Sequence, residues 1–406
     1  MPTEEMGTGG DSWGPSGGCF TRQVPLLQAL SMSAPRLLYV VTEDWYFLSH
    51  RLPMARAAKA AGYEVHVASR FTEGRAVIEK EGFVPHALSW SRGSLSAFGS
   101  LSAVLELRRL LRKLDPDILH NISLKPVLLG TTASLGLSHM AVVNSVTGLG
   151  TLFIGEAKVS GITRGAVRFA LKHLLRRQRS KTVVQNPDDR AFVIDLGAPA
   201  ESVALIPGSG VDTKLLTPLP EPPPPVTAAY VGRMLADKGV HTLIQAFALL
   251  GKRGSSLQLL LAGDTDKENP GSLVPEQLRE FASLYGISWL GHVADIRGVW
   301  ARAHFAVLAS RREGLPKSLL EAAACGRAMV ATDAPGCREI AIEAETALTV
   351  PVDDVNALAA AMEKLAGDAA LREKFGKAAR ALVEAKFSAE SIGRQTVALY
   401  ESLKAP

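Results

Sequence analysis

The stretch HFAVLASRREGLPKSLLEAAACGRAMVATD, from His304 to Asp333, divides into a strand, a loop, a helix and a second strand. Short apolar runs such as HFAVLAS and AMVATD are typical of buried parallel strands, and a helix between them completes a βαβ unit. Glu313 lies in the loop, and Glu321 follows eight residues later inside the helix. The stretch therefore predicts an α/β fold with two carboxylates near one strand end.

The same alternation of strand and helix extends in both directions along the chain. It begins at RLLYVV (36–41), recurs up to KTVVQN (181–186), pauses at PLPEPPPP (218–225) and restarts at VTAAYVGR (226–233). Consecutive prolines exclude a helix and favour an extended connection. We predict two tandem Rossmann-like, doubly wound domains at 36–206 and 207–387, with a cleft between them. An amphipathic helix at 388–406 is expected to pack back on the first domain.

Composition limits the class of protein. A chain of 406 residues is long enough for two full cores, and its three cysteines form neither a CxxC pair nor a regular framework. We therefore expect no metal site and a reducing cytoplasmic location. No apolar run approaches the length that spans a bilayer, and residues 1–35 are expected to be a disordered extension, with Met32 as an alternative start.

Positive charge is concentrated in the segment from Lys158 to Lys181. KVSGITRGAVRFALKHLLRRQRSK holds eight Lys or Arg and no acidic residue, and its apolar residues recur at helical spacing. A basic amphipathic helix of this kind is suited to an anionic membrane surface. A solvated helix face over the domain core is an equally good interpretation of the pattern.

Two common nucleotide-binding motifs are missing from the sequence. The first strand leads into TEDWYFLSHR, which has no glycine, and PGSGVD (207–212) is an incomplete GxGxxG that opens no helix. There is also no GxxxxGK[ST] segment. A dinucleotide-dependent dehydrogenase and a P-loop protein are therefore excluded as far as motifs decide.

Other polar residues follow predicted strands in the second domain. Arg233 and Lys238 in VGRMLADKG lie just beyond a strand end, where α/β sheets bind ligands, and two cations there suit a diphosphate. Pro316 opens the helix that carries Glu321, and a buried carboxylate in an apolar helix suits a ribose diol. Ordinary loop cations and helix-decorating glutamates are the alternative interpretation.

The string GRMLADKG…LAGD…EGLPKSLLEAAACGRAMVATDAPGCREI resembles the retaining nucleotide-sugar glycosyltransferases of family 4, which have the GT-B fold. The resemblance covers nearly the whole chain from Arg36. DILHNISLKP, VNSVTGLG and GDTDKENPGS look most like bacterial enzymes that extend lipid-linked glycans in capsule or exopolysaccharide assembly. EAETALTV departs from the family, where an Asn-Gly is usual.

The resemblance implies roles for individual residues. In such enzymes Glu313 approaches the donor sugar, Glu321 holds the ribose, Arg233 and Lys238 stabilise the leaving diphosphate without a metal, and His120 faces the transferred sugar. It also places Gly263, Gly314, Leu315 and Pro316 around the nucleotide, and Asn121 and Lys125 near the acceptor. The first domain is then the acceptor domain and the second is the donor domain.

The expected activity is retaining transfer of a hexose or N-acetylhexosamine from a UDP-sugar to an undecaprenyl-diphosphate-linked glycan. The expected location is the cytoplasmic face of the plasma membrane, where the protein would be peripheral. Its expected partners are the nucleotide-sugar donor, the lipid-linked glycan acceptor and an anionic membrane surface, and not nucleic acid. A GT-B epimerase acting on a UDP-sugar is the alternative enzyme. An inactive nucleotide-sugar sensor or scaffold is the alternative of another class.

Overall fold

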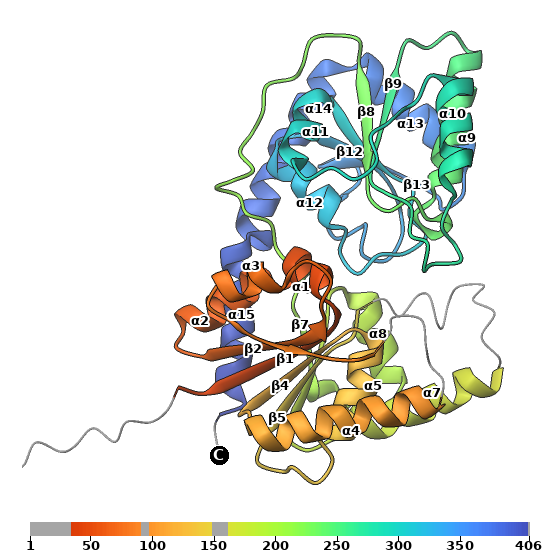
Figure 1. Ribbon diagram of the computed structural model, residues 1–406. Coiled ribbons are helices and arrows are strands. Elements are labelled where there is room, and N and C mark those ends of the chain that lie inside the picture. Colours follow the sequence, from red (N-terminus) through yellow and green to blue (C-terminus); the bar gives the residue numbers. More distant parts are fainter. Residues whose placement is uncertain (1–33, 91–96, 148–160, 405–406) are drawn as a thin grey trace, which may run out of the picture. The chain divides into compact units, whose positions relative to one another are not determined.

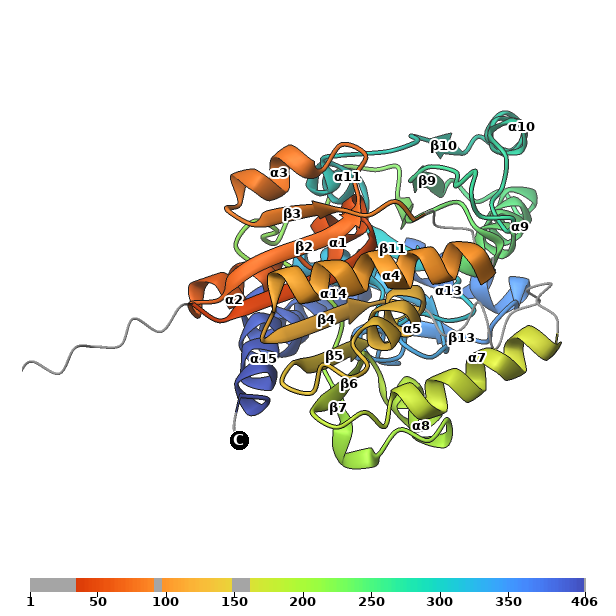
Figure 2. The ribbon, with the colours of Figure 1, turned by 60° about the horizontal axis from the view of Figure 1, so that its bottom comes forward.

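A computed structural model describes residues 34–90, 97–147 and 161–404 (Figures 1 and 2). The predicted extension lies almost wholly outside the described residues. So do the start of the basic segment, up to Ser160, and the last three residues of VNSVTGLG, 148–150. Within the described residues the chain forms two parallel sheets, each covered by helices. The prediction of two tandem doubly wound domains is confirmed.

The first sheet has seven strands in the order β3-β2-β1-β4-β5-β6-β7 within the described residues. Its strands are β1 (Arg36–Glu43), β2 (Glu64–Arg70), β3 (Val84–Ala87), β4 (Ile118–Ile122), β5 (Ala141–Ser145), β6 (Ser180–Val184) and β7 (Val203–Leu205). Its helices are α1 (Asp44–His50), α2 (Leu52–Ala60), α3 (Arg75–Lys80), α4 (Ala97–Leu114), α5 (Leu124–Ala133), α7 (Gly161–Leu174) and α8 (Pro187–Asp195). The strand order reverses between β1 and β4.

Strand β1 shows why helices cover both faces of this sheet. Leu37 and Tyr39 belong to one core, with residues of α1, α2 and α3, whereas Leu38 and Val40 belong to another, with residues of α4 and α5. Successive strand residues point to opposite faces, so an uninterrupted apolar strand needs helices on both sides. RLLYVV is such a strand, which is why its apolar run has no polar alternation.

The second sheet has six described strands in the order β10-β9-β8-β11-β12-β13. They are β8 (Thr227–Val231), β9 (Gln258–Ala262), β10 (Ser288–Trp289), β11 (Phe305–Leu308), β12 (Ala328–Thr332) and β13 (Ala347–Val350). The helices are α9 (Val240–Lys252), α10 (Pro275–Tyr285), α11 (Ile296–Arg302), α12 (Lys317–Ala324), α13 (Val355–Gly367) and α14 (Ala369–Leu382). Here the order reverses between β8 and β11.

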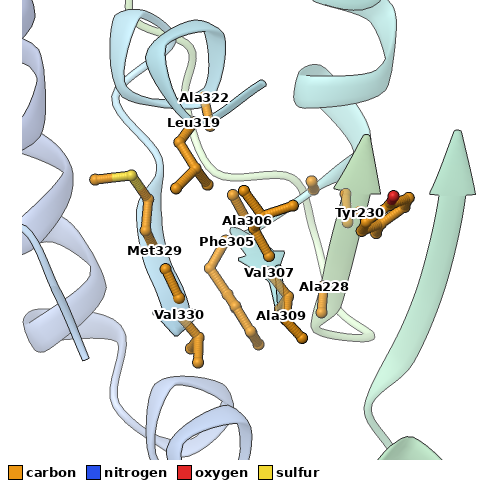
Figure 3. Close-up of a cluster of buried hydrophobic side chains, with 14 of the residues drawn as sticks. Ala228, Tyr230, Phe305, Ala306, Val307, Ala309, Leu319, Ala322, Met329 and Val330 are labelled. Atoms are coloured by element: carbon orange, nitrogen blue, oxygen red, sulfur yellow. The ribbon is translucent and has the colours of Figure 1, made fainter. Parts of the chain in front are cut away.

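The core of the second sheet fixes the helix that carries Glu321. Leu319 and Ala322 of α12 lie in one apolar cluster with residues of β8, β11 and β12, and both are at most 1% exposed (Figure 3). Close packing of this kind leaves α12 little freedom to rotate. The carboxylate of Glu321 is therefore held in a defined position by its apolar neighbours in the sequence.

The last helix, α15 (Ala389–Ser402), follows a π-helical turn at Val383–Phe387. Its residues Ile392 and Tyr400 are fully buried in the core that α1, α2 and α3 form with the first sheet. The Tyr400 hydroxyl lies 2.7 Å from the hydroxyl of Tyr39 on β1. The chain thus returns to the first sheet after completing the second.

No helix in the described part of the chain is both long and apolar enough to cross a membrane.

Candidate functional site

Two loops of the second sheet meet at the point where its strand order reverses. The loop after β8 carries Arg233 and Lys238, and the loop after β11 carries Ser310 and Glu313. In open parallel sheets the carboxyl ends of the two strands at this point leave room for a ligand. The residues that the sequence singled out are therefore at the position where the topology favours binding.

Glu313 is held by both of its carboxylate oxygens. Lys238 Nζ donates a hydrogen bond to Oε2 at 2.6 Å, and Ser310 Oγ donates to Oε1 at 2.7 Å. The side chains of Lys238 and Glu313 are 21% and 13% exposed, so their pair is largely shielded from water. A diphosphate that binds Lys238 would compete with this carboxylate for the same ammonium group.

Arg233 has a partner of its own. Its Nη1 donates to Asp266 Oδ2 at 2.8 Å, and the arginine side chain is 42% exposed. An exposed ion pair contributes only about 0–1 kcal/mol to stability, so a more highly charged ligand can replace it at low cost. Asp266 lies in GDTDKENPGS, a segment that the sequence analysis did not assign to the charge of the site.

Glu321 is buried one turn into α12. Its side chain is 10% exposed, and Lys317 Nζ lies 3.2 Å from Oε1 as a helical neighbour four residues away. Burial raises the pKa of the Glu321 carboxyl, and the adjacent lysine opposes this shift. A carboxylate held in this position is suited to accept hydrogen bonds from ligand hydroxyls.

Two glycines allow close backbone approach at this site. A Cβ at Gly263, after β9, would lie 1.8 Å from the carbonyl oxygen of Gly232, and Gly263 has a φ of +142°. A Cβ at Gly314 would lie 1.9 Å from Gln185 Oε1. Gly263 requires glycine for steric reasons, independently of any ligand contact, whereas the Gln185 side chain could turn away from a Cβ at position 314. The adjoining Leu315 and Pro316 are buried and lead into α12.

His120 lies on β4 of the first sheet, at the sheet's own reversal point. Its ring is 2% exposed, with Nδ1 2.7 Å from the Tyr400 hydroxyl and Nε2 2.7 Å from Ser145 Oγ. Burial, with a smaller contribution from the charge of Arg51, lowers the pKa of His120 well below its ordinary value, so the ring is neutral. A contact between His120 and a sugar would require one of these two hydrogen bonds to be exchanged.

The two residues expected near the acceptor lie in different surroundings. Asn121 is fully buried, and its Nδ2 donates to Asn144 Oδ1 at 3.0 Å. Lys125, by contrast, is half-buried at the start of α5, with its Nζ 5.8 Å from the centre of the Trp90 ring. Of the two, only Lys125 is placed where a ligand could reach it without rearrangement of a strand.

The arrangement is suited to stabilising a leaving anion. Lys238 and Arg233 supply positive charge at one strand end, the N-terminus of α12 lies after the next strand, and Glu321 offers a hydroxyl acceptor beside it. Among the described residues, no group of three or more His, Cys, Asp or Glu side chains could hold a metal ion.

Sequence reasoning did not identify Ser310, Asp266 and Gln185 as part of this site. Ser310 precedes Glu313 by three residues in the stretch that was singled out, so its contact could have been anticipated from spacing. Gln185 follows β6 and lies against the Glu313 loop, as does its neighbour Asn186, whose Nδ2 donates to the Gly314 carbonyl at 2.7 Å across 128 residues of sequence. No local pattern indicates such a contact.

Comparison with known proteins indicates the family to which the chain belongs. The family model described as "Glycosyl transferase 4-like" matches residues 36–184, and the one described as "Glycosyl transferases group 1" matches residues 225–368. Together the two models cover most of both sheets.

Two curated relatives align over nearly their full length. The capsular polysaccharide biosynthesis glycosyltransferase CapM of Staphylococcus aureus is 24% identical over 91% of this chain and 98% of its own. The N,N'-diacetylbacillosaminyl-diphospho-undecaprenol alpha-1,3-N-acetylgalactosaminyltransferase of Campylobacter jejuni is 26% identical over 82% of this chain and 91% of its own.

A solved structure shares the fold. HepE of Anabaena, crystallised with UDP and glucose, superposes with a TM-score of 0.73 over 90% of this chain and 99% of its own, at 19% identity. Both family models and the named relatives indicate a glycosyltransferase. The two sheets and the polar loops at their strand ends fit this assignment. The chain is an enzyme that belongs to the GT-B glycosyltransferases of family 4.

Proposed function

We propose that the protein transfers a hexose or N-acetylhexosamine from a UDP-sugar, with retention of anomeric configuration, to a glycan carried on a lipid diphosphate at a membrane surface. The observation that carries the proposal is the contact between Lys238 and Glu313 at the reversal point of the second sheet. The loop that holds Glu313 leads into α12, where Glu321 is buried. This set offers cations for a diphosphate and a carboxylate for hydroxyl groups.

The donor half of the proposal follows from what each group can bind. Lys238 and Arg233 would hold the diphosphate and stabilise its charge as the glycosidic bond breaks, which removes the need for a metal ion. Glu321 would accept hydrogen bonds from the ribose, and Glu313 would be free to approach the sugar once Lys238 turns to phosphate. The HepE complex with UDP and glucose, in the same fold, supports UDP as the nucleotide.

A thermal-shift screen with UDP-, GDP- and ADP-sugars tests the donor. A ligand that binds only the native state stabilises it by RT ln(1 + [L]/Kd), or about 2.7 kcal/mol at a hundredfold excess over Kd. We expect UDP-hexoses to raise the melting temperature more than GDP- or ADP-hexoses at equal concentration. Absence of any shift with UDP-sugars would contradict the proposed donor.

The acceptor half is supported by the Campylobacter relative, whose name specifies a sugar on diphospho-undecaprenol. An acceptor of this kind stays in the bilayer, so the enzyme must approach the membrane, and we place it at the cytoplasmic face. Helix α7 offers a surface for this contact. Its Arg168 and Lys172 are exposed, and Phe169 between them is 67% exposed.

Several other described residues of the basic segment are engaged within the protein. Leu171 and Leu175 are buried in a core with α5 and α8, and Arg177 donates to the carbonyl oxygens of Leu137 and Met140 at 2.7 and 2.9 Å. The apolar stripe expected at a membrane is therefore used largely for folding. Among the described residues of α7, Lys172, Phe169 and Arg168 remain for a lipid surface, and the pair of Arg168 with Asp195 at 3.0 Å is exposed and therefore weak.

We expect the protein to sediment with anionic vesicles and not with neutral ones, and to be released by high salt. Each basic residue near an anionic surface contributes roughly 1 kcal/mol, so changing Arg168 and Lys172 to Glu should weaken binding by about 30-fold or more. Changing Lys252 and Lys364 of the donor domain to Glu is a control with the same change in charge. Equal loss in both double variants, or equal binding to neutral vesicles, would exclude α7 as the docking surface.

A further inference from the structure

Arg51 lies in the first domain, between two short helices that follow β1. It is the single residue between α1 and α2, in the connection that follows β1. The strand order of this sheet reverses between β1 and β4, so Arg51 lies beyond one of the two strands that flank the reversal point. In doubly wound folds ligands bind beyond the carboxyl ends of the strands at the reversal point, although no glycine-rich motif is present here.

The guanidinium of Arg51 is buried and only partly bonded. The residue is 3% exposed, its Nη1 lies 3.5 Å from Met54 Sδ, and neither Nε nor Nη2 has a hydrogen-bond partner. It forms no ion pair with any residue that the structure describes. A buried charge without compensating bonds is unfavourable, so the fold retains Arg51 at the expense of stability.

Two other buried arginines show what a structural arginine looks like in this chain. Arg327 is 1% exposed, and its Nε, Nη1 and Nη2 each donate to a backbone carbonyl at 2.7–3.1 Å. Arg372 is 5% exposed and forms a two-bond pair with Glu221. Both are satisfied within the protein, whereas Arg51 is not.

Arg51 lines a small pocket at the carboxyl ends of the strands. Besides Arg51, its lining includes His120, Ser145, Thr147, Gln185 and Gly208, and the rest of its wall is mainly apolar. It is narrow, with room for about one water molecule at most, so it admits a single oxygen atom and not a whole sugar ring.

This pocket adjoins the loop that carries Glu313. Gln185, one of its lining residues, contacts Gly314, and a Cβ on Gly208 would lie 2.7 Å from Leu315 Cδ2. An oxygen that enters the pocket would therefore belong to a molecule bound beside the Glu313 loop. Guanidinium groups bind phosphate oxygens through strong, charge-assisted hydrogen bonds.

We propose that Arg51 is a phosphate-binding residue of the first sheet, and that its free N–H groups bind an oxygen of a diphosphate. This inference rests on the proposed function, because that diphosphate is carried either by the nucleotide-sugar donor or by the lipid-linked acceptor. Arg51 thus adds a cation to Arg233 and Lys238, from the opposite sheet.

Calorimetry and melting of an Arg51→Met variant test the proposal, with UDP and farnesyl diphosphate as the two probes. We expect affinity for at least one probe to fall by roughly tenfold to a hundredfold, as for loss of a hydrogen bond to a charged group. Loss for UDP alone assigns Arg51 to the donor, and loss for farnesyl diphosphate alone assigns it to the acceptor. The ligand-free variant should melt at the same temperature as the unaltered protein or higher, since a buried unpaired charge is removed.

Arg327→Met is the matched control, and it should melt lower because three carbonyl groups lose their donor. If Arg51→Met does not fold, Arg51→Gln and Arg51→Lys provide the same comparison with smaller changes in shape. Unchanged affinity for both probes in a folded Arg51 variant would overturn the phosphate site alone. Failure of the unaltered protein to bind either probe would overturn the proposed function as well.

Discussion

Replacing Lys238 by alanine lowers kcat by roughly two to three orders of magnitude. The ammonium group of Lys238 is largely shielded from water and would face the diphosphate as it gains charge, where one such donor is worth about 2.7–4 kcal/mol of the barrier. Arg233→Ala should reduce kcat less, because that side chain is 42% exposed and therefore more fully screened. Steady-state kinetics with saturating UDP-sugar measures both effects.

Lys252→Ala is the control for the lysine variant, since Lys252 is an exposed cation at the far end of α9. Its turnover should equal that of the unaltered protein. Melting curves check that Lys238→Ala is folded, because the variant loses one of the two hydrogen bonds that the described residues make to the Glu313 carboxylate. Near-normal kcat in both Lys238→Ala and Arg233→Ala would show that the leaving group is stabilised elsewhere.

Replacing Glu321 by glutamine weakens UDP and the UDP-sugar by the same factor, roughly tenfold or more, with little change in kcat. The ribose is bound equally in the ground state and the transition state, so a lost ribose contact is a loss of uniform binding. Hydrogen bonds to a charged group contribute about 1.5–3 kcal/mol, which sets the size of the effect. Titration calorimetry with UDP alone measures it.

The Glu313→Gln variant distinguishes the role of Glu313 from that of Glu321. Glu313 is expected to approach the sugar, which UDP lacks, so this variant should lose turnover while binding UDP normally. If Glu321→Gln keeps its UDP affinity and loses catalysis instead, the assigned roles of the two carboxylates would have to be exchanged.

The stability of Glu321→Gln provides an independent check with a definite sign. Burial raises the pKa of Glu321 in the folded protein, so the native state binds this proton more tightly than the unfolded chain does. The resulting stability is present below the ordinary carboxyl pKa and is lost as pH rises through the raised value. The variant should therefore melt no lower than the unaltered protein at neutral pH.

Most of the fold could be predicted because its strands are buried and apolar. RLLYVV, LQLLLAGD and HFAVLAS are runs that fit only the interior of a covered parallel sheet, and each one is a strand in the structure. Strand β3 (VPHA) was not predicted, because it lies at the sheet edge, contains a proline and has no buried residue. Helix α1 was not predicted either, since DWYFLSH is too short for helical periodicity to show.

The residues of the candidate site could be proposed from the sequence, but their contacts could not. Lys238 and Glu313 were both placed at strand ends, and the topology brings them within hydrogen-bonding distance across 75 residues. The bond between His120 and Tyr400 spans 280 residues and joins the first sheet to the last helix. Arg51 was not predicted because its importance lies in bonds that it does not make, which only the packed structure reveals.

The most direct test is the anomeric configuration of the product. The protein is incubated in EDTA with an α-linked UDP-hexose or UDP-N-acetylhexosamine and a sugar on a lipid diphosphate, and the new linkage is assigned by NMR. Retaining, metal-independent transfer predicts a product with an α-linkage that forms only when the acceptor is present. A β-linked product, or a changed free sugar released without the acceptor, would contradict it.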